Sequence, residues 1–203
     1  MESVPLSLGL PRPERGDAAR NRRHLLDVAR QMVAESGAEK VTMDGLAERA
    51  GLGKGTVFRR FRTRAGIFHA LLDEDEAAFQ QSVLSGPPPL GPGAGPVTRL
   101  IAFGHARIEF LFTHAAIARA SLDTNQPTPV SVGIAQSQIR MLLGRADIGV
   151  RDLETLAIQL TAALEGPILL YLRAPAEDDA ELIRRSLADG WQTLIERLCG
   201  APR

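Results

Sequence analysis

Apolar residues recur at helical spacing along most of the chain, and no stretch shows the regular alternation of apolar and polar residues that predicts a β-strand. The spacing predicts a first helix over residues 17–36, with Asp17 as its N-cap and Gly37 as its C-terminal stop. The segment before it, residues 1–16, contains three prolines and two glycines. We therefore expect residues 1–16 to be a disordered arm.

The rest of the chain also reads as helix, interrupted by a loop at residues 86–96 that is rich in glycine and proline. The predicted fold class is all-α, with about nine helices arranged as a small N-terminal domain over residues 17–64 and a larger helical bundle over residues 65–203. Beyond the first 62 residues, helices are predicted over residues 63–84, 97–112, 114–123, 130–143, 152–173 and 177–199.

Residues 42–61 predict two short helices joined by a glycine turn. Thr42 can cap the first of them, because its hydroxyl can accept a hydrogen bond from a free backbone N–H. Gly51 stands at the turn, where a positive φ is easy only for glycine. The apolar face of this first short helix is formed by Met43, Leu46, Ala47 and Ala50.

The second short helix, which follows Gly53, has little apolar surface and many cations. Val57 and Phe61 are four residues apart and give it one inward side. A glycine at position 55 weakens it further as an isolated helix. Its composition makes sense if the exposed face docks against phosphates, and the pair of helices then forms a helix-turn-helix whose second helix fits the DNA major groove.

The ordered set of motifs between Arg20 and Leu72 resembles the TetR family of bacterial transcriptional regulators. This resemblance implies an all-helical, dimeric regulator that binds DNA at one end and a small molecule at the other, and that is most often a repressor. The matching segments are Leu-Leu-Asp-Val-Ala at 25–29, Ala-Glu-Ser-Gly at 34–37, Val-Thr-Met-Asp-Gly-Leu-Ala at 41–47 and Ala-Gly-Leu-Gly-Lys-Gly-Thr-Val-Phe-Arg-Arg-Phe at 50–61.

Nine residues of this module are expected at the operator, as readers of DNA or as phosphate contacts at helix N-termini. Three of them depart from the family pattern: Gly53 replaces a usual serine, Phe58 a common tyrosine, and Arg60 a common histidine. Arg60 would be a permanently charged phosphate contact. The expected DNA-binding residues are Thr42, Gly53, Lys54, Gly55, Thr56, Phe58, Arg59, Arg60 and Arg64.

The distribution of charge agrees with a DNA-binding N-terminal end. The chain has a formal net charge of zero, but residues 1–64 hold 13 Lys or Arg against 8 Asp or Glu, whereas residues 65–203 hold 11 against 16. A basic head on an acidic body is expected when one end meets phosphate and the other does not. Arg12 and Arg15 of the arm could reach a neighbouring minor groove or be a solvated tail, and the sequence leaves both open.

The last two predicted helices form an antiparallel hairpin, which the resemblance pairs with its twin across a dimer interface. We expect core on one side of the apolar stripe and dimer surface on the other. The expected interface residues are Leu160, Leu164, Ile168, Leu187, Trp191 and Leu194. A ligand cavity is implied among the central helices, with His105, Arg107, Gln138 and Tyr171 as polar candidates to line it, although ordinary surface positions explain most of them equally well.

Parts of the sequence are compatible with two other functions. Residues 51–56 resemble the phosphate-binding loop of a nucleotide-binding enzyme, but that loop needs an earlier glycine, where Glu48 stands, and a preceding buried strand. A ligand-independent architectural DNA-binding protein would not need the large apolar segment over residues 97–173. We therefore expect a protein that is not an enzyme and that needs no cofactor or metal.

The remaining expectations concern location. A single cysteine, Cys199, allows no intramolecular disulfide and suits a reducing cytoplasm. The first residues do not form a signal peptide, and no apolar run is long enough to span a membrane. The partners expected from the motifs and the family resemblance are double-stranded DNA with a pseudo-palindromic operator, a small-molecule ligand and a second copy of the chain.

Overall fold

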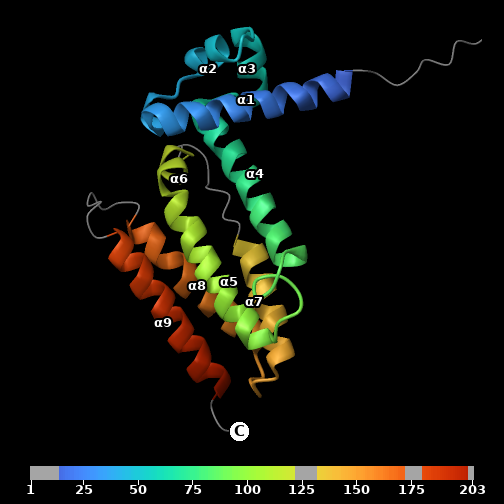
Figure 1. Ribbon diagram of the computed structural model, residues 1–203, viewed down its shortest axis with the longest axis vertical. Coiled ribbons are helices and arrows are strands. Elements are labelled where there is room, and N and C mark those ends of the chain that lie inside the picture. Colours follow the sequence, from blue (N-terminus) through green and yellow to red (C-terminus); the bar gives the residue numbers. More distant parts are fainter. Residues whose placement is uncertain (1–13, 122–131, 172–179, 201–203) are drawn as a thin grey trace, which may run out of the picture. The chain divides into compact units, whose positions relative to one another are not determined.

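The structure is a computed structural model, which describes residues 14–121, 132–171 and 180–200. All of the regular elements in these residues are helical, as predicted (Figure 1). They are α1 (Glu14–Ser36), the short 3₁₀ helix η1 (Ala38–Lys40), α2 (Met43–Arg49), α3 (Lys54–Phe61), α4 (Arg64–Ser85), α5 (Pro96–Thr113), α6 (Ala115–Ser121), α7 (Val132–Ala146), α8 (Leu153–Tyr171) and α9 (Ala180–Gly200).

Two features differ from the expected elements. The first helix begins at Glu14 rather than after Asp17, so residues 14–16 of the expected arm are helical. The turn η1 was not expected, because three residues carry no periodic pattern. The rest of the arm, including Arg12, lies outside the described residues.

The chain divides into two compact units between Ala70 and Leu71, within helix α4. The first unit contains α1, η1, α2, α3 and the start of α4. Its core is filled by apolar side chains from all of these elements, because each helix turns one stripe inward. The fully or almost fully buried side chains include Leu25, Leu26, Val41, Leu46, Val57, Phe61, Ile67 and Phe68.

The second unit is built around α5, which packs against α7, α8 and α9 (Figure 1). The sequence predicted this central place, because α5 is apolar nearly all round. Its core includes Leu100, Phe103, Ile139, Leu143, Leu160 and Ile195. The glycine- and proline-rich loop before α5 is held by buried Arg99, whose guanidinium donates to the carbonyl oxygens of Val83 at 3.1 Å and Leu90 at 3.4 Å.

Helices α5 and α9 are in close contact at Gly104 and Trp191. The indole N–H of Trp191 donates to the carbonyl oxygen of Leu100 at 3.0 Å, so the polar atom of a buried ring is satisfied. A Cβ on Gly104 would lie 1.9 Å from the Nε1 atom of Trp191. The glycine is therefore what lets the indole lie against α5.

Candidate nucleic-acid interface

Helix α2 begins as the sequence predicted. Thr42 is the N-cap residue, and its hydroxyl oxygen accepts a hydrogen bond from the backbone N–H of Gly45 at 3.0 Å. A Cβ at Gly45 would lie 3.0 Å from that hydroxyl oxygen, so a larger residue would crowd the cap. The cap fixes the start of α2 next to the turn that leads to α3.

The turn between α2 and α3 depends on Gly51, whose φ is +64°. A left-handed conformation is costly for residues with a Cβ, so the turn favours glycine at this position. The backbone N–H groups of Gly51 and Leu52 donate to the carbonyl oxygens of Glu48 and Ala47, which closes the end of α2. This hydrogen-bonded turn sets the direction in which α3 leaves.

One face of α3 is fixed inward by two residues. Val57 is fully buried and Phe61 almost so, while Lys54, Phe58, Arg59 and Arg60 are exposed. Successive residues of an α-helix advance by about 100°, so the side opposite Val57 and Phe61 is formed by Gly55, Thr56 and Arg59. The outward face therefore carries one cation, one hydroxyl and a position without a side chain.

The glycines at the start of α3 leave space in front of the helix. A Cβ built on Gly53 or Gly55 would meet no atom of the protein within 4 Å. Neither glycine is therefore needed for packing within the chain. Gly55 weakens the helix by roughly 0.5–1 kcal/mol relative to alanine, a cost that close approach of another molecule to the backbone would explain.

The side of α3 that faces α2 carries Lys54 and Phe58. The ammonium of Lys54 lies 2.8 Å from a carboxylate oxygen of Asp44, and both side chains are mostly exposed. Such a surface ion pair contributes little to stability, so Lys54 can exchange Asp44 for a phosphate. The ring of Phe58 is 64% exposed, so it is accessible to another molecule.

The opposite side of α3 faces α1 through Arg60. Its Nη2 atom donates to the backbone carbonyl oxygen of Ala18 at 2.7 Å. Sequence reasoning missed this bond, because a backbone acceptor 42 residues away leaves no trace in local composition. Arg60 therefore connects the two helices and holds its guanidinium at the space between them.

Arg64 lies at the start of α4 and is also occupied within the chain. Its guanidinium donates to the carbonyl oxygens of Val41 at 2.7 Å and Ala38 at 2.6 Å, and it lies over the ring of Phe68. These bonds fix the approach to α2. A phosphate contact by Arg64 remains a prediction, which would use the donors that these bonds leave over.

Two further contacts hold α2 against α1. The Nε2 atom of His24 lies 3.1 Å from the carbonyl oxygen of Ala50, which is satisfied when that nitrogen carries the proton. Arg49 makes two hydrogen bonds of 2.5 Å to the carboxylate of Glu35, and these hydrogen bonds lower the pKa of Glu35. The helix-turn-helix is thus fixed to α1 at several points.

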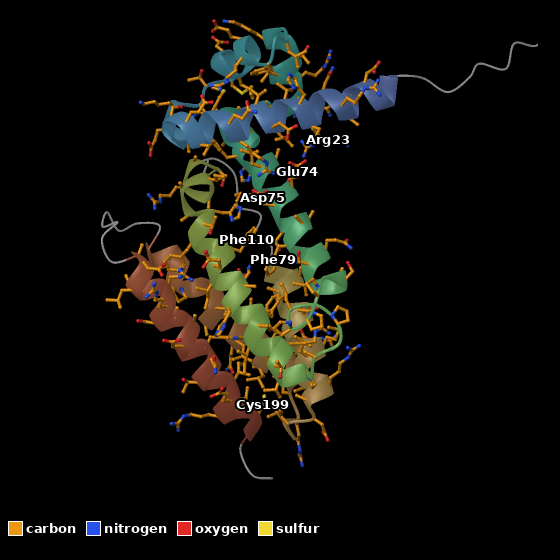
Figure 2. All side chains as sticks on the ribbon, viewed as in Figure 1. Arg23, Glu74, Asp75, Phe79, Phe110 and Cys199 are labelled. Atoms are coloured by element: carbon orange, nitrogen blue, oxygen red, sulfur yellow. The ribbon has the colours of Figure 1, made fainter. Side chains whose placement is uncertain are left out.

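The first of the expected ligand residues, Arg107, takes part in buried ion pairs. Arg107 is almost fully buried, and its guanidinium pairs with Glu76 at 2.5 Å and with Glu165 at 3.0 Å. It also lies over the rings of Phe79 and Phe110, which face each other across α4 and α5 (Figure 2). Arg107 therefore joins α4, α5 and α8 through buried ion pairs.

The other three ligand candidates lie on α5, α7 and α8. The Nε2 atom of His105 lies 3.1 Å from the carbonyl oxygen of Ala188, which ties α5 to α9. Gln138 is buried on α7. Tyr171 closes α8, and its side chain lies outside the described part. The expectation that His105, Arg107, Gln138 and Tyr171 line a ligand pocket stays a prediction.

The expected dimer residues separate into two groups. Leu160 and Leu164 are buried within the chain. Trp191 is buried as well: its indole is held by Leu100 and Gly104, and it also borders the pocket formed by α5, α8 and α9, so its place at a dimer surface stays a prediction. In the second group, Leu187 is half-buried and Leu194 is 43% exposed, while the side chain of Ile168 is not described.

A shallow pocket of about 210 Å³ lies where α5, α8 and α9 meet. Ala163 and Leu164 contribute to it from α8, and Leu187, Gly190 and Leu194 from α9. A Cβ at Gly190 would meet nothing within 4 Å, so this surface is open. Its apolar lining and small residues form a groove suited to another helix.

The phosphate-loop alternative is contradicted by the elements that surround residues 51–56. The residues before Gly51 form helix α2, whereas that loop must follow a buried strand.

Within residues 14–121, 132–171 and 180–200, no helix is both long and apolar enough to cross a bilayer.

Comparison with known proteins shows which family the first unit is similar to. Residues 25–71 match the sequence profile of the "Bacterial regulatory proteins, tetR family". The HTH-type transcriptional repressor Rv1474c of Mycobacterium tuberculosis is 36% identical over 66 residues, which are 32% of this chain and 35% of that protein. An HTH-type transcriptional regulator of Staphylococcus aureus is 30% identical over 65 residues, with the same shares covered. The chain thus spans about a third of the length of these curated relatives.

Solved structures extend the likeness to the whole fold. A TetR-family transcriptional regulator from Pectobacterium atrosepticum matches 93% of this chain and 99% of its own, with a TM-score of 0.73 and 18% identity. The fatty acid degradation regulator FadR from Bacillus halodurans matches 89% of this chain and 99% of its own, with a TM-score of 0.59 and 14% identity. At these identities the likeness concerns the fold alone.

Proposed function

We propose that this chain, which belongs to the TetR family of bacterial regulatory proteins, is a homodimeric DNA-binding transcription regulator that acts in the cytoplasm. It reads a pseudo-palindromic operator with α3 of each copy, and a small-molecule ligand in the second unit releases it from DNA. We further propose that it represses the genes it controls. An architectural DNA-binding protein is less well supported, because such a protein needs no second unit of this size.

The observation that carries the proposal is the outward face of α3. Gly53 and Gly55 leave the backbone open, and Thr56 and Arg59 lie on the side opposite the buried residues. Arginine on such a helix can donate two hydrogen bonds to guanine in the major groove, and the open glycine lets the helix come close to the bases. We infer that Arg59 is the main reader among the expected residues.

The flanking residues are proposed to hold the DNA backbone. Lys54 and Phe58 lie on one side of the reading face and Arg60 on the other. Backbone contacts position a protein on the duplex without reading sequence, so they should set affinity and salt dependence. Thr42 and Arg64, at the starts of α2 and α4, are proposed to support phosphates from the same side.

Arg59→Ala tests the reading role directly. Loss of a bidentate base contact should weaken operator binding about tenfold or more and relax selectivity against mutated operators. Arg151→Ala is the matched control, because Arg151 is exposed in the second unit and its removal costs the same charge. Equal binding by both variants, measured by fluorescence anisotropy, would contradict the assignment of Arg59.

The proposed dimer surface is the groove between α8 and α9. Ala163 and Gly190 permit a close approach, and Leu194 offers exposed apolar surface beside them. Pairing of this face with its copy would bury the groove in a four-helix contact. A two-fold dimer would place the two α3 helices on half-sites roughly 34–36 Å apart, as helix-turn-helix proteins require.

Leu194→Arg tests this surface, because two buried arginines would face each other across the two-fold axis. We expect a folded monomer in sedimentation experiments and loss of tight operator binding. Leu84→Arg is the control, since Leu84 is 64% exposed on α4 and lies away from the groove. A Leu194→Arg protein that still sediments as a dimer would contradict the interface.

Ligand control is proposed from the second unit as a whole. A ligand can release DNA only if it binds the DNA-incompetent state more tightly than the competent one. The groove of about 210 Å³ is small for a ligand, so a larger cavity would have to open when the ligand binds. The proposed ligand control is tested by a screen for compounds that lower operator affinity. The Leu84→Arg protein is screened in parallel.

A further inference from the structure

A cleft of about 350 Å³ separates α1 from α3 in the first unit. Its floor is the fully buried side chain of Leu25. Asn21 borders it from α1, and Thr56, Arg59 and Arg60 border it from α3. It therefore adjoins the outward face of α3 on the side away from α2, where none of the roles assigned so far explains it.

The charge around the cleft is positive. Arg59 and Arg60 contribute two cations from α3. The carboxylate of the lining residue Asp17 is paired with the guanidinium of Arg20, so its charge is compensated within α1. An anionic group entering the cleft would therefore meet a net attraction, with one neutral amide on the α1 side.

The Arg60 guanidinium is held in position at this cleft. One of its five N–H groups donates to the carbonyl oxygen of Ala18 at 2.7 Å, which leaves the others for a bound group. Because Ala18 belongs to α1, the same bond fixes the width of the cleft. An arginine whose fork is fixed in this way loses less side-chain entropy when it binds an anion.

We propose that this cleft takes a phosphodiester group of the operator backbone, with Asn21 as the donor from α1 and Arg60 as the donor from α3. Asn21 lies on the exposed side of α1, and its amide offers two N–H donors. The inference rests on the proposed DNA-binding function. It adds α1 as a second wall of the DNA site, so that one strand of the backbone is held between the two helices.

The test combines a protein variant with a change in the DNA. Each phosphate of the operator is replaced in turn by a neutral methylphosphonate, and binding is measured for the wild-type protein and for Asn21→Ala. The control is Gln31→Ala, an amide on the exposed side of the same helix that does not line the cleft. Circular dichroism confirms that both variants fold.

We expect Asn21→Ala to weaken binding about tenfold, as for a hydrogen bond to a charged group. At one phosphate in each half-site, the methylphosphonate should weaken the wild type but have little further effect on Asn21→Ala, because the two changes remove the same contact. Gln31→Ala should behave like the wild type at every phosphate. Additive effects of Asn21→Ala and methylphosphonate at all positions would overturn the proposal.

The design separates this inference from the proposed function. Selective operator binding by the wild type without coupling to Asn21 would support the proposed regulator and overturn the phosphate-binding role of the cleft. Absence of selective binding by the folded wild type would overturn both proposals. A competition series with inorganic phosphate at constant ionic strength forms the last arm. Competition by phosphate that is lost in Asn21→Ala, without coupling between Asn21 and any methylphosphonate, would assign the cleft to free phosphate and overturn the assignment to the DNA backbone.

Discussion

At the scale of single residues, glycines divide into those that the fold needs and those that it does not. Gly51 supplies a positive φ and Gly104 makes room for an indole, so both are required by the chain itself. Gly55 has neither reason, since its φ is ordinary for a helix and the space in front of it is empty. Because Gly55 also lies on the outward face of α3, we infer that the open space in front of it serves the approach of DNA.

Gly55→Ala should therefore separate stability from DNA binding. Alanine should stabilise the protein by about 0.5–1 kcal/mol, because it is the better helix former and its Cβ meets nothing. The same methyl group on the outward face should weaken operator binding. Urea denaturation and an operator titration measure the two effects. Gly133→Ala on α7, also open, is the control and should leave DNA binding unchanged. Unchanged binding by Gly55→Ala would contradict the close approach.

The carboxylate of Glu181 provides a pH test at the same scale. Hydrogen bonds from Arg184, and to a smaller extent from Arg185, lower the pKa of this carboxylate to about 2. A lowered carboxylate pKa favours the folded state above the ordinary value near 4.5, and this contribution is lost as the pH falls toward 2. A carboxyl-detected NMR titration should find Glu181 still ionised at acidity that protonates other glutamates. Arg184→Gln should raise its pKa, and an unchanged value would contradict the pairing.

At the scale of elements, the sequence predicted helices well wherever capping and stop signals frame an apolar stripe. The limits of the helix-turn-helix could be predicted from Thr42, Gly51 and Gly53, because a cap or a turn glycine acts on the backbone of neighbouring residues. Helix α1 begins at Glu14, before the predicted N-cap Asp17, because the prolines that predicted a disordered arm end at Pro13. Contacts between elements could not be predicted in the same way. The hydrogen-bond partners of Arg107 and Trp191 lie 31 to 91 residues away along the chain, so local patterns leave no trace of them.

The contact between α5 and α9 is testable through Gly104. Gly104→Ala would place a Cβ 1.9 Å from the Trp191 indole, so the two helices must move apart. Overpacking of this kind destabilises proteins by about 1–3 kcal/mol. Gly144→Ala is the control, because its Cβ would make an ordinary contact of 3.8 Å with Leu153. Equal thermal stability of the two variants would show that α5 and α9 do not pack as described.

At the scale of the whole molecule, the two units have different chemical character. The first places cations and open backbone on its surface, and the second buries an arginine between two glutamates from α4 and α8. The proposed regulator uses the first unit to bind DNA and the second to pair with its copy and to bind a ligand. The sequence predicted this division from its charge asymmetry, but it could not predict which side chains of the second unit face a partner.

The buried pair is expected to hold the second unit together. Arg107→Met keeps much of the side-chain volume but leaves the carboxylates of Glu76 and Glu165 without their cation. Removing one partner of a buried ion pair typically costs about 3–5 kcal/mol. Denaturation should show a loss of this order, with Arg140→Met as the control, because Arg140 pairs with Glu154 at an exposed site. A similar stability for both variants would contradict a structural role for Arg107.

The central claim is tested most directly by measuring binding to DNA from the protein's own upstream region, against random competitor DNA and across a series of salt concentrations. The account predicts selective binding of a dimer, a footprint with two-fold symmetry, and an affinity that falls steeply with salt as phosphate contacts release counterions. A folded dimer that binds these fragments no better than random DNA, and selects no sequence from a random pool, would contradict it.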